Sequence, residues 1–423
     1  MELCYDGLNP SKNAWDSNYV TCNRTFMAVC WHAAGGGSFG VIPLEKTGKI
    51  PADYPLVAGH KAAVLDIECN PFNESLIASC SEDVTVKVWQ IPEGGLTETM
   101  REPLQNLIGH KRKVGQVRHN PVADNVLAST STDYTVKVWD IESGDSMFSL
   151  EGHKDIIQDC QWNRNGTQIV TTSKDKKTRI ADPRAGSISQ EWMAHEGVKG
   201  SRAIWLGKLD KVCTVGFSKM SDRQMAVWDP RNTEKALAKE NIDTASGLLL
   251  PFFDEDTLML YIAGKGDGNV RYYEVAEDGA NVWYLSEFKS STPMKGMCAV
   301  PKVALKINEC EVMRLMKLGT HNVQPISFNV PRKSEMFQDD LFPDTYAHKP
   351  SMNASDYKGG KTADPITVSL ADGFVPIEKP KEIKVEKKTE DEGPQDEKKL
   401  REQWKALKNR VAYLEAELAK RDA

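Results

Sequence analysis

The 423-residue sequence lacks the features that mark several classes of protein. No apolar stretch approaches the roughly 18 residues of a membrane-spanning helix, so we expect no such helix. The first residues, MELCYDGLNPSKNAWD, contain no basic segment followed by an apolar run, which argues against a signal peptide. The net charge is only −6, and it gives no general attraction to nucleic acid or to an anionic membrane.

Patterns typical of disulfide scaffolds, metal sites and nucleotide sites are also missing. The nine cysteines are scattered, without a C-x-x-C pair or a histidine at ligand spacing. This usage is typical of a reducing compartment, so we expect a cytoplasmic protein that needs no metal or cofactor. The segment 35–40 matches G-x-G-x-x-G, but no helical pattern follows it to hold a pyrophosphate. We interpret it as a hairpin turn.

An internal repeat governs the first three quarters of the chain. His60 is followed after 23 residues by Asp83 and six residues later by Trp89, and His110 begins a second copy with the same offsets. Two further copies are less regular, and a fifth, degenerate copy contains Asp267. A period of roughly 43 to 50 residues with these signatures predicts four-stranded propeller blades. The residues expected to hold the blades together are His60, Asp83, Trp89, His110, Asp133, Trp139, His153, Asp175, His195, Asp222 and Trp228.

The chemistry of the repeat explains why these residue types recur. An aspartate at a tight turn can accept a hydrogen bond from the histidine, whose other nitrogen can bond a strand hydroxyl (Ser79 or Ser81 in the first copy). The tryptophan N–H can donate to the same hydroxyl and complete a buried network. Serine, histidine and aspartate in series also describe a hydrolase triad. Because the set recurs in several copies, we expect a structural role, no catalytic residue and no enzyme activity.

The strand patterns before and after the five copies, which span roughly 57–280, predict two more blades. The predicted fold is all-β: a seven-bladed WD-repeat β-propeller with a C-terminal extension, a flexible linker and a short parallel coiled-coil helix. The predicted boundaries are 1–335 for the propeller, 336–375 for an extension packed on it, 376–396 for a charged linker and 397–423 for the coiled coil.

Several segments carry a more specific resemblance. They include AWDSNYV (14–20), AAGGGSFGVIP (33–43), VWQIPEGGLTE (88–98), VGFSKMSDRQMAVWDPR (215–231) and FNVPRKSEMFQDDLFPDTY (328–346). With these, the sequence resembles the coronins almost from end to end. The resemblance implies a scaffold at the cell cortex that binds and bundles actin filaments and contacts the branch-nucleating actin-related protein complex. The alternative is a general WD-repeat adaptor that binds peptides on the propeller without depending on filaments.

The resemblance also points to one difference and to candidate contact residues. In the family a basic-aromatic strand that helps to close the ring precedes a Cys-Tyr pair, but here Cys4-Tyr5 lies almost at the first residue, so the sequence leaves the closure open. A family cation that follows this pair aligns with Asn9, and Lys12 is the nearest cation. Cations clustered on loops could attract an acidic filament, although each cluster could equally be a solvated turn. The candidates are Lys12, Lys111, Arg112, Lys113, Lys174, Lys176, Lys177 and Arg179.

The last residues show a heptad pattern. Apolar residues alternate at spacings of four and three, with an arginine and a glutamate at flanking positions suited to a salt bridge between chains. The residues are Leu400, Trp404, Leu407, Arg410, Val411, Leu414, Glu415 and Leu418. The pattern predicts self-association, and the R-h-x-x-h-E spacing resembles a family motif for parallel trimers. A homotrimer is therefore favoured, a dimer or tetramer is also compatible, and an amphipathic helix docked on another surface is the alternative.

Overall fold

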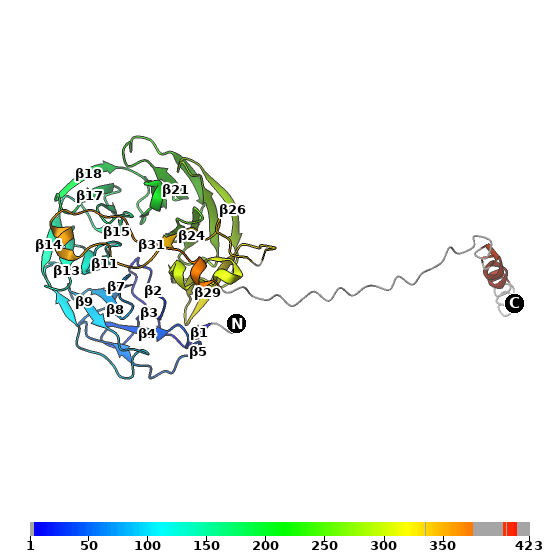
Figure 1. The fold of residues 1–423 in the computed structure, drawn as a ribbon, viewed down its shortest axis with the longest axis horizontal. Helices are drawn as coiled ribbons and strands as arrows, with labels where there is room; N and C mark the ends of the chain where they lie inside the picture. The colour runs from blue at the N-terminus through cyan, green and yellow to red at the C-terminus, as the bar shows by residue number, and fades with distance from the viewer. Residues whose placement is uncertain (1–3, 335, 375–400, 403, 413–423) are drawn as a thin grey trace. The chain divides into compact units, whose positions relative to one another are not determined.

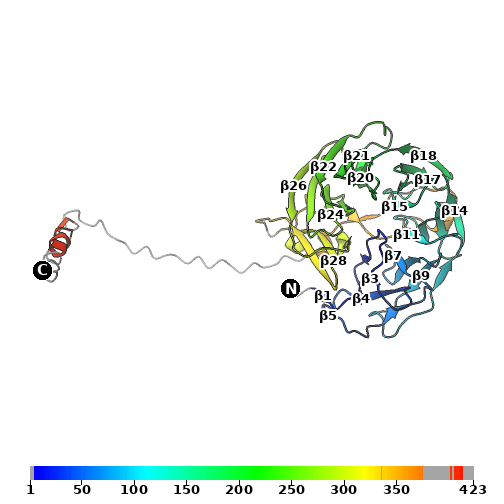
Figure 2. The same ribbon diagram turned by 180° about the vertical axis from the view of Figure 1, so that it is seen from behind.

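A computed structural model describes residues 4–334, 336–374, 401–402 and 404–412. Within these residues, seven sheets of four or five strands surround a central axis (Figures 1 and 2). The seven-bladed propeller predicted from the repeat is therefore confirmed. Strands rich in β-branched residues form the blades because such side chains pack well between two pleated sheets.

The first three blades follow the chain in order. Blade 1 contains β2 (Val20–Cys22), β3 (Phe26–Trp31), β4 (Ser38–Pro43) and β6 (Leu56–Val57). Blade 2 contains β7 (Val64–Cys69), β8 (Leu76–Ser81), β9 (Val86–Gln90) and β10 (Gln105–Leu107). Blade 3 contains β11 (Val114–His119), β12 (Val126–Ser131), β13 (Val136–Asp140) and β14 (Ser146–Leu150). In each blade the first strand lies nearest the axis.

The remaining blades continue around the ring. Blade 4 contains β15 (Ile157–Trp162), β16 (Ile169–Ser173), β17 (Thr178–Asp182) and β18 (Ser187–Trp192). Blade 5 contains β19 (Arg202–Trp205), β20 (Val212–Phe217), β21 (Arg223–Trp228) and β22 (Ala238–Asp243). Blade 6 contains β23 (Leu249–Asp254), β24 (Met259–Gly264), β25 (Val270–Val275) and β26 (Val282–Phe288). Short 3-10 helices occur at η1 (Gly207–Leu209), η2 (Lys302–Ala304), η3 (Ile307–Glu309) and η4 (Ala371–Gly373).

Blade 7 joins the two ends of the propeller. It contains β27 (Gly296–Ala299), β28 (Glu311–Leu318) and β29 (Asn322–Asn329), together with β1 (Tyr5–Asp6) and β5 (Gly48–Lys49). β1 pairs antiparallel with β29, and the buried Tyr5 donates a hydrogen bond to the carbonyl of Leu44 at 2.5 Å. The question of closure that the sequence left open is thus answered, because the short strand directly after Cys4 pairs with the last blade.

The repeat residues of blades 2 and 3 form the expected network. The Nδ1 atom of His110 lies 3.0 Å from Asp133, and its Nε2 atom lies 2.8 Å from the Ser129 hydroxyl. Trp139 donates to the same hydroxyl at 2.7 Å. The set in blade 2 is equivalent, and of the two serines considered there the histidine contacts Ser79. Each of these polar groups is buried and has its partner, so the network fixes strand register instead of forming a reactive site.

Blades 4 and 5 depart from the expected pattern. His153 and His195 keep their bonds to the strand hydroxyls of blade threonines, at 2.9 and 3.0 Å, but the Nδ1 atom of each is buried without a partner. Asp175 instead forms an ion pair with Arg179, and Asp222 bonds within its own turn. The expectation that these two aspartates bind their histidines is therefore wrong.

The buried histidines make the fold sensitive to acid. Burial lowers the pKa of His195 to about 4, whereas the unfolded chain keeps the ordinary value near 6.5. The unfolded chain therefore takes up this proton first, and stability is lost as the pH falls from about 6.5 towards 4. Between pH 7 and pH 5 we expect His195 alone to cost about 2 kcal/mol. In urea melts at pH 7 and pH 5, the free energy of unfolding of His195→Gln should fall by about 2 kcal/mol less than that of the parent protein. Equal falls would show that His195 is not the source of the acid sensitivity.

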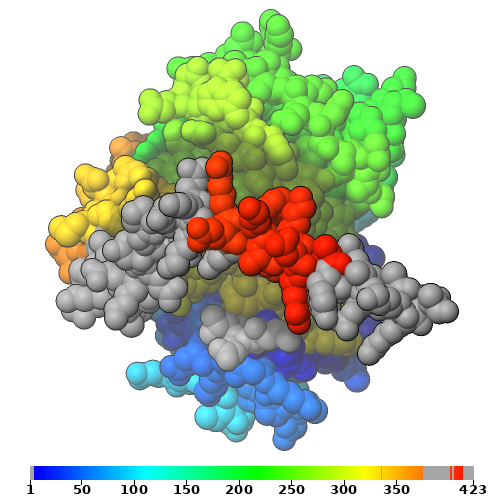
Figure 3. All heavy atoms as spheres, turned by 90° about the vertical axis from the view of Figure 1, so that its right-hand side faces the viewer, coloured from blue at the N-terminus to red at the C-terminus, as the bar shows by residue number. Residues whose placement is uncertain are grey.

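Residues 336–374 cross one face of the propeller as a strap. Its elements are β30 (Thr345–Tyr346), α1 (Ala354–Lys358) and β31 (Thr367–Val368). Met352 pairs with Ala123 in a turn of blade 3, and Tyr357 packs edge-on against Trp162 of blade 4. Figure 3, an edge-on view of the propeller, shows the orange atoms of this segment on one side. Among the described residues, none of the helices has the length and apolar character to cross a membrane.

Candidate binding face of the propeller

The two faces of the propeller differ in what covers them. The upper face carries the loops with the repeat histidines and the turns with the repeat aspartates, because both lie at the same end of their strands. The lower face carries the turns between the first and second strands, and the strap binds to these turns. The backbone N–H of Asp124 donates to the carbonyl of Met352, and the Tyr346 hydroxyl donates to the carbonyl of Pro121. The upper face is thus the open one for a large partner.

A loop formed by residues 11–18 lies across the mouth of the central channel on the upper face. Trp15 donates to the carbonyl of Gly115 at 2.8 Å, and Lys113 lies over its ring, 5.1 Å from the centroid. Lys265 of blade 6 also holds this loop, because it donates to the carbonyl of Ser17 at 3.2 Å. Burial lowers the pKa of Lys265 to about 8. The loop is therefore attached to several blades, and it carries Lys12 in a fixed setting.

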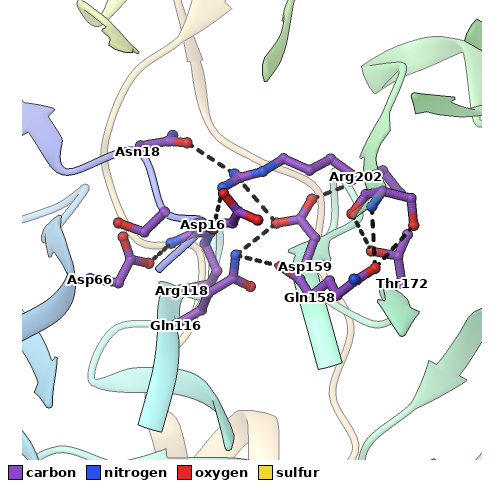
Figure 4. A network of polar contacts seen from close by, with 12 residues as sticks. Asp16, Asn18, Asp66, Gln116, Arg118, Gln158, Asp159, Thr172 and Arg202 are labelled. Carbon is purple, nitrogen blue, oxygen red and sulfur yellow. Dashed lines mark hydrogen bonds and ion pairs between the residues drawn. The ribbon is translucent and has the colours of Figure 1, made fainter. Parts of the chain in front are cut away.

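Charged side chains in the channel bind one another below this loop (Figure 4). Arg118 contacts Asp66 at 2.6 Å, and Arg202 lies 3.8 Å from Asp159. Arg202 also donates to the side chain of Asn18 at 2.9 Å. These buried side chains of opposite charge neutralise each other, and Arg202 also binds the loop through Asn18. Within the described residues, no group of three or more side chains is arranged to hold a metal ion.

The structure places most of the predicted cations on the upper face. Lys12, Lys111, Arg112 and Lys174 are exposed. Lys113 is half-buried, 3.8 Å from Glu82, and Lys176 donates to the carbonyl of Glu196 at 2.8 Å. Lys177 is also half-buried and pairs with Glu191 at 3.5 Å. The predicted residues therefore lie on one face, but only some of them offer a free ammonium or guanidinium group.

Arg179, predicted as one of the cations that contact a filament, is buried and cannot do so. Its side chain is 1% exposed and bridges Asp175 at 2.7 Å and Glu191 at 2.8 Å. It stands four residues after the turn aspartate, where the two regular copies have lysine, and its guanidinium takes the carboxylate away from His153. A cluster of basic letters could not show this, because a strand sends alternate side chains to opposite faces.

Sequence reasoning also missed part of the surface. A lysine follows the histidine in each of the first three repeat copies: Lys61, Lys111 and Lys154, and all three are exposed. The turn aspartate of each copy accepts from the backbone N–H of this lysine, at 2.8, 2.9 and 3.3 Å. The recurring Gly-His-Lys triplet was the available signal. The turn aspartates therefore also position a row of cations, Lys61, Lys111 and Lys154, which we call the lysine arc.

The C-terminal segment is a separate unit of the chain. Residues 401–402 and 404–412 are described as helix. Trp404, Leu407 and Val411 are 67%, 66% and 50% exposed, and Lys408 lies over the ring of Trp404. Exposed apolar residues at spacings of three and four form a stripe that the described residues of this helix leave uncovered. Arg410 lies in the same helix, whereas Leu400, Leu414, Glu415 and Leu418 lie outside the described residues.

Comparisons with known proteins agree with this architecture. A model of the WD domain, G-beta repeat, matches residues 54–90, 101–140 and 144–182. A model described as a type of WD40 repeat matches 323–365, and a domain of unknown function matches 1–49. The 323–365 match is notable because it includes β29 and the first part of the strap.

Relatives of known name match the whole chain. Coronin-A of Dictyostelium discoideum is 57% identical over 422 residues, which cover 100% of this chain and 94% of the relative. Human coronin-2B is 44% identical over 434 residues, covering 100% and 90%. The solved WD40 domain of a Toxoplasma gondii coronin superimposes with a TM-score of 0.83 at 33% identity, covering 88% of this chain and 96% of that one. A chain of the mitotic checkpoint complex, with a TM-score of 0.60 at 13% identity, shares the fold alone.

Proposed function

The chain belongs to the coronin family, and from this premise we propose that it binds actin filaments through the upper face of its propeller. The observation that carries the proposal is the lysine arc, with Lys12, Arg112 and Lys174 beside it on the same open face. Actin filaments have an acidic surface, and clustered cations on a rigid face both attract such a surface and orient it. The protein acts as a scaffold and carries no catalytic site in this account.

The C-terminal helix supplies the second half of the proposed function. A chain with one filament site cannot join two filaments, but an oligomer with several sites can. We propose that the apolar stripe of Trp404, Leu407 and Val411 is covered by other copies in a parallel trimer. Such an assembly would bundle filaments and could link them to the branch-nucleating actin-related protein complex at the cell cortex.

The direct test of the function is co-sedimentation with actin filaments at low salt. The protein should pellet with filaments and stay in the supernatant with monomeric actin. If it binds other proteins equally well and ignores filaments, the chain is a general WD-repeat adaptor instead.

Reversing the charges of Lys111, which belongs to the lysine arc, and of the adjacent Arg112 should weaken binding to actin filaments. The double variant Lys111→Glu/Arg112→Glu changes two exposed side chains on the upper face. We expect about a tenfold loss of affinity and a shallower dependence on salt, because exposed ion pairs contribute modestly and are screened. The matched control is Lys349→Glu/Lys358→Glu, which makes the same charge change on the exposed surface of the strap. Equal losses of filament affinity in both variants would show that binding depends on net charge and not on the upper face.

A further inference from the structure

Apolar side chains are exposed on the upper face where the lysine arc ends. The fourth repeat histidine, His195, is followed by Glu196 instead of lysine, and the arc stops there. In the same loop Val198 is 74% exposed, and in the neighbouring turn of blade 5 Met220 is 82% exposed. Single exposed apolar side chains are common, but apolar residues that share one surface and are rimmed by polar groups mark interaction sites.

The two segments are held against each other. The backbone N–H of Gly197 donates to the carbonyl of Phe217 at 2.8 Å, so the loop with Val198 runs beside the end of β20. Lys199 extends over the ring of Phe217, with its ammonium 4.8 Å from the centroid. The exposed apolar residues therefore belong to one surface built from the boundary of blades 4 and 5.

Hydrogen bonds within the 218–222 turn fix the position of Met220. The Ser218 hydroxyl lies 3.0 Å from the carboxylate of Asp222, and it accepts from the N–H of Met220 at 3.1 Å. Ser221 has a φ of 70°, a conformation that costs a non-glycine residue energy and persists only when neighbours enforce it. The matching turns of blades 2 and 3 have the same geometry: Val84 and Tyr134 have φ values of 67° and 71°, and the repeat aspartate before each donates its N–H to a serine hydroxyl as Met220 does. Blade 5 thus keeps the rigid turn of the repeat but has methionine where blades 2 and 3 have aspartate.

The charges around these residues indicate what kind of surface they fit. Lys219 is exposed directly before Met220, Lys199 is exposed directly after Val198, and Lys176 of blade 4 reaches the carbonyl of Glu196. We call Val198, Lys199, Lys219 and Met220 the Met220 patch. An apolar centre with a charged rim is the usual anatomy of a binding site for a protein. A cationic rim selects an acidic partner, and an unbranched methionine adapts to an uneven apolar surface.

We propose that the Met220 patch is the apolar anchor of the filament interface, and that it packs against an apolar residue on the acidic surface of actin. This inference rests on the proposed function. The lysine arc then supplies attraction and orientation, while the patch supplies short-range contact that slows dissociation. The arc lies on blades 2 to 4 and the patch on blade 5, at the same end of their strands, so one large flat partner can cover both.

The double variant Val198→Ser/Met220→Ser tests the anchor without changing charge. We expect filament affinity to fall about 10- to 30-fold, as for a removed apolar hot spot, with an unchanged salt slope. The matched control is Leu237→Ser/Leu285→Ser, which removes two apolar residues that are 41% and 46% exposed at the outer strands of blades 5 and 6, away from the upper face. The control should bind like the parent protein. If the parent pellets with filaments and the patch variant pellets equally well, the anchor is refuted and the proposed function stands; if the parent fails to pellet, the proposed function itself has failed.

Hydroxyl-radical footprinting gives a second test that needs no variant. Met220 oxidises readily when exposed, and its oxidation should slow at least fivefold when filaments saturate the protein. Met336, which is 74% exposed on the strap, is the internal reference and should oxidise at the same rate in both states. An equal rate at Met220 with and without bound filaments would overturn the proposal even if the variant proved unstable.

Discussion

Trp139→Ala is expected to lower the free energy of unfolding by about 4 kcal/mol, because it removes a large core side chain and breaks a buried network at the same time. Trp139 is 1% exposed, and its ring lies edge-on to His110 at a centroid distance of 6.0 Å. Its loss leaves a cavity between blades and takes one of two partners from the Ser129 hydroxyl. Urea melts followed by circular dichroism measure the change.

Two comparisons separate the contributions to this loss. Trp139→Phe keeps most of the apolar volume and removes the N–H donor, so it should cost about 1–2 kcal/mol. Trp404→Ala removes an exposed ring of the C-terminal helix and should leave the propeller melt unchanged. If Trp139→Ala melts at the same urea concentration as the parent, the network does not stabilise the blade.

Leu407→Ala/Leu414→Ala is expected to convert the oligomer into single chains. Both leucines occupy the same heptad position, and alanine removes most of the apolar area that a partner helix would cover. A helix of about three heptads has little stability alone, so the loss should be complete at micromolar concentration. Light scattering should report a mass that falls from about three chains to one chain of 47.1 kDa.

Asn409→Ala is the control for this prediction, because position 409 lies on the outside of the proposed coiled coil. It should keep the parent mass. An unchanged mass in the leucine variant would contradict the coiled coil, and a parent mass of one chain would favour docking of the apolar stripe on another surface.

The repeat made most of the architecture predictable. The offsets from His60 and His110 to their aspartates and tryptophans correspond to real hydrogen-bond networks, and the flanking strand patterns give two more blades. Closure was harder to predict, because β1 contains only two residues and its pairing with Val323 spans most of the chain. A strand this short has no recognisable periodicity.

The candidate surface was predictable in outline and not in detail. The sequence located the cations of the upper face, but it could not show that Arg179 is buried in ion pairs, since its partner Glu191 comes from the next strand. It also gave no reason to separate Met220 from the core methionines. Its exposure follows from its place in the turn, where Met220 donates to Ser218 as the repeat aspartates of blades 2 and 3 donate to Ser81 and Ser131.

In the proposed function the propeller binds filaments and the C-terminal helix multiplies that binding. The most direct test is high-speed co-sedimentation with actin filaments across a salt series, with the full chain and a chain that ends at Asp396. We expect tight, salt-sensitive binding of the full chain and binding weaker by about two orders of magnitude for the shortened one. The proposed function would be contradicted if neither chain pellets with filaments at low salt, or if both pellet equally.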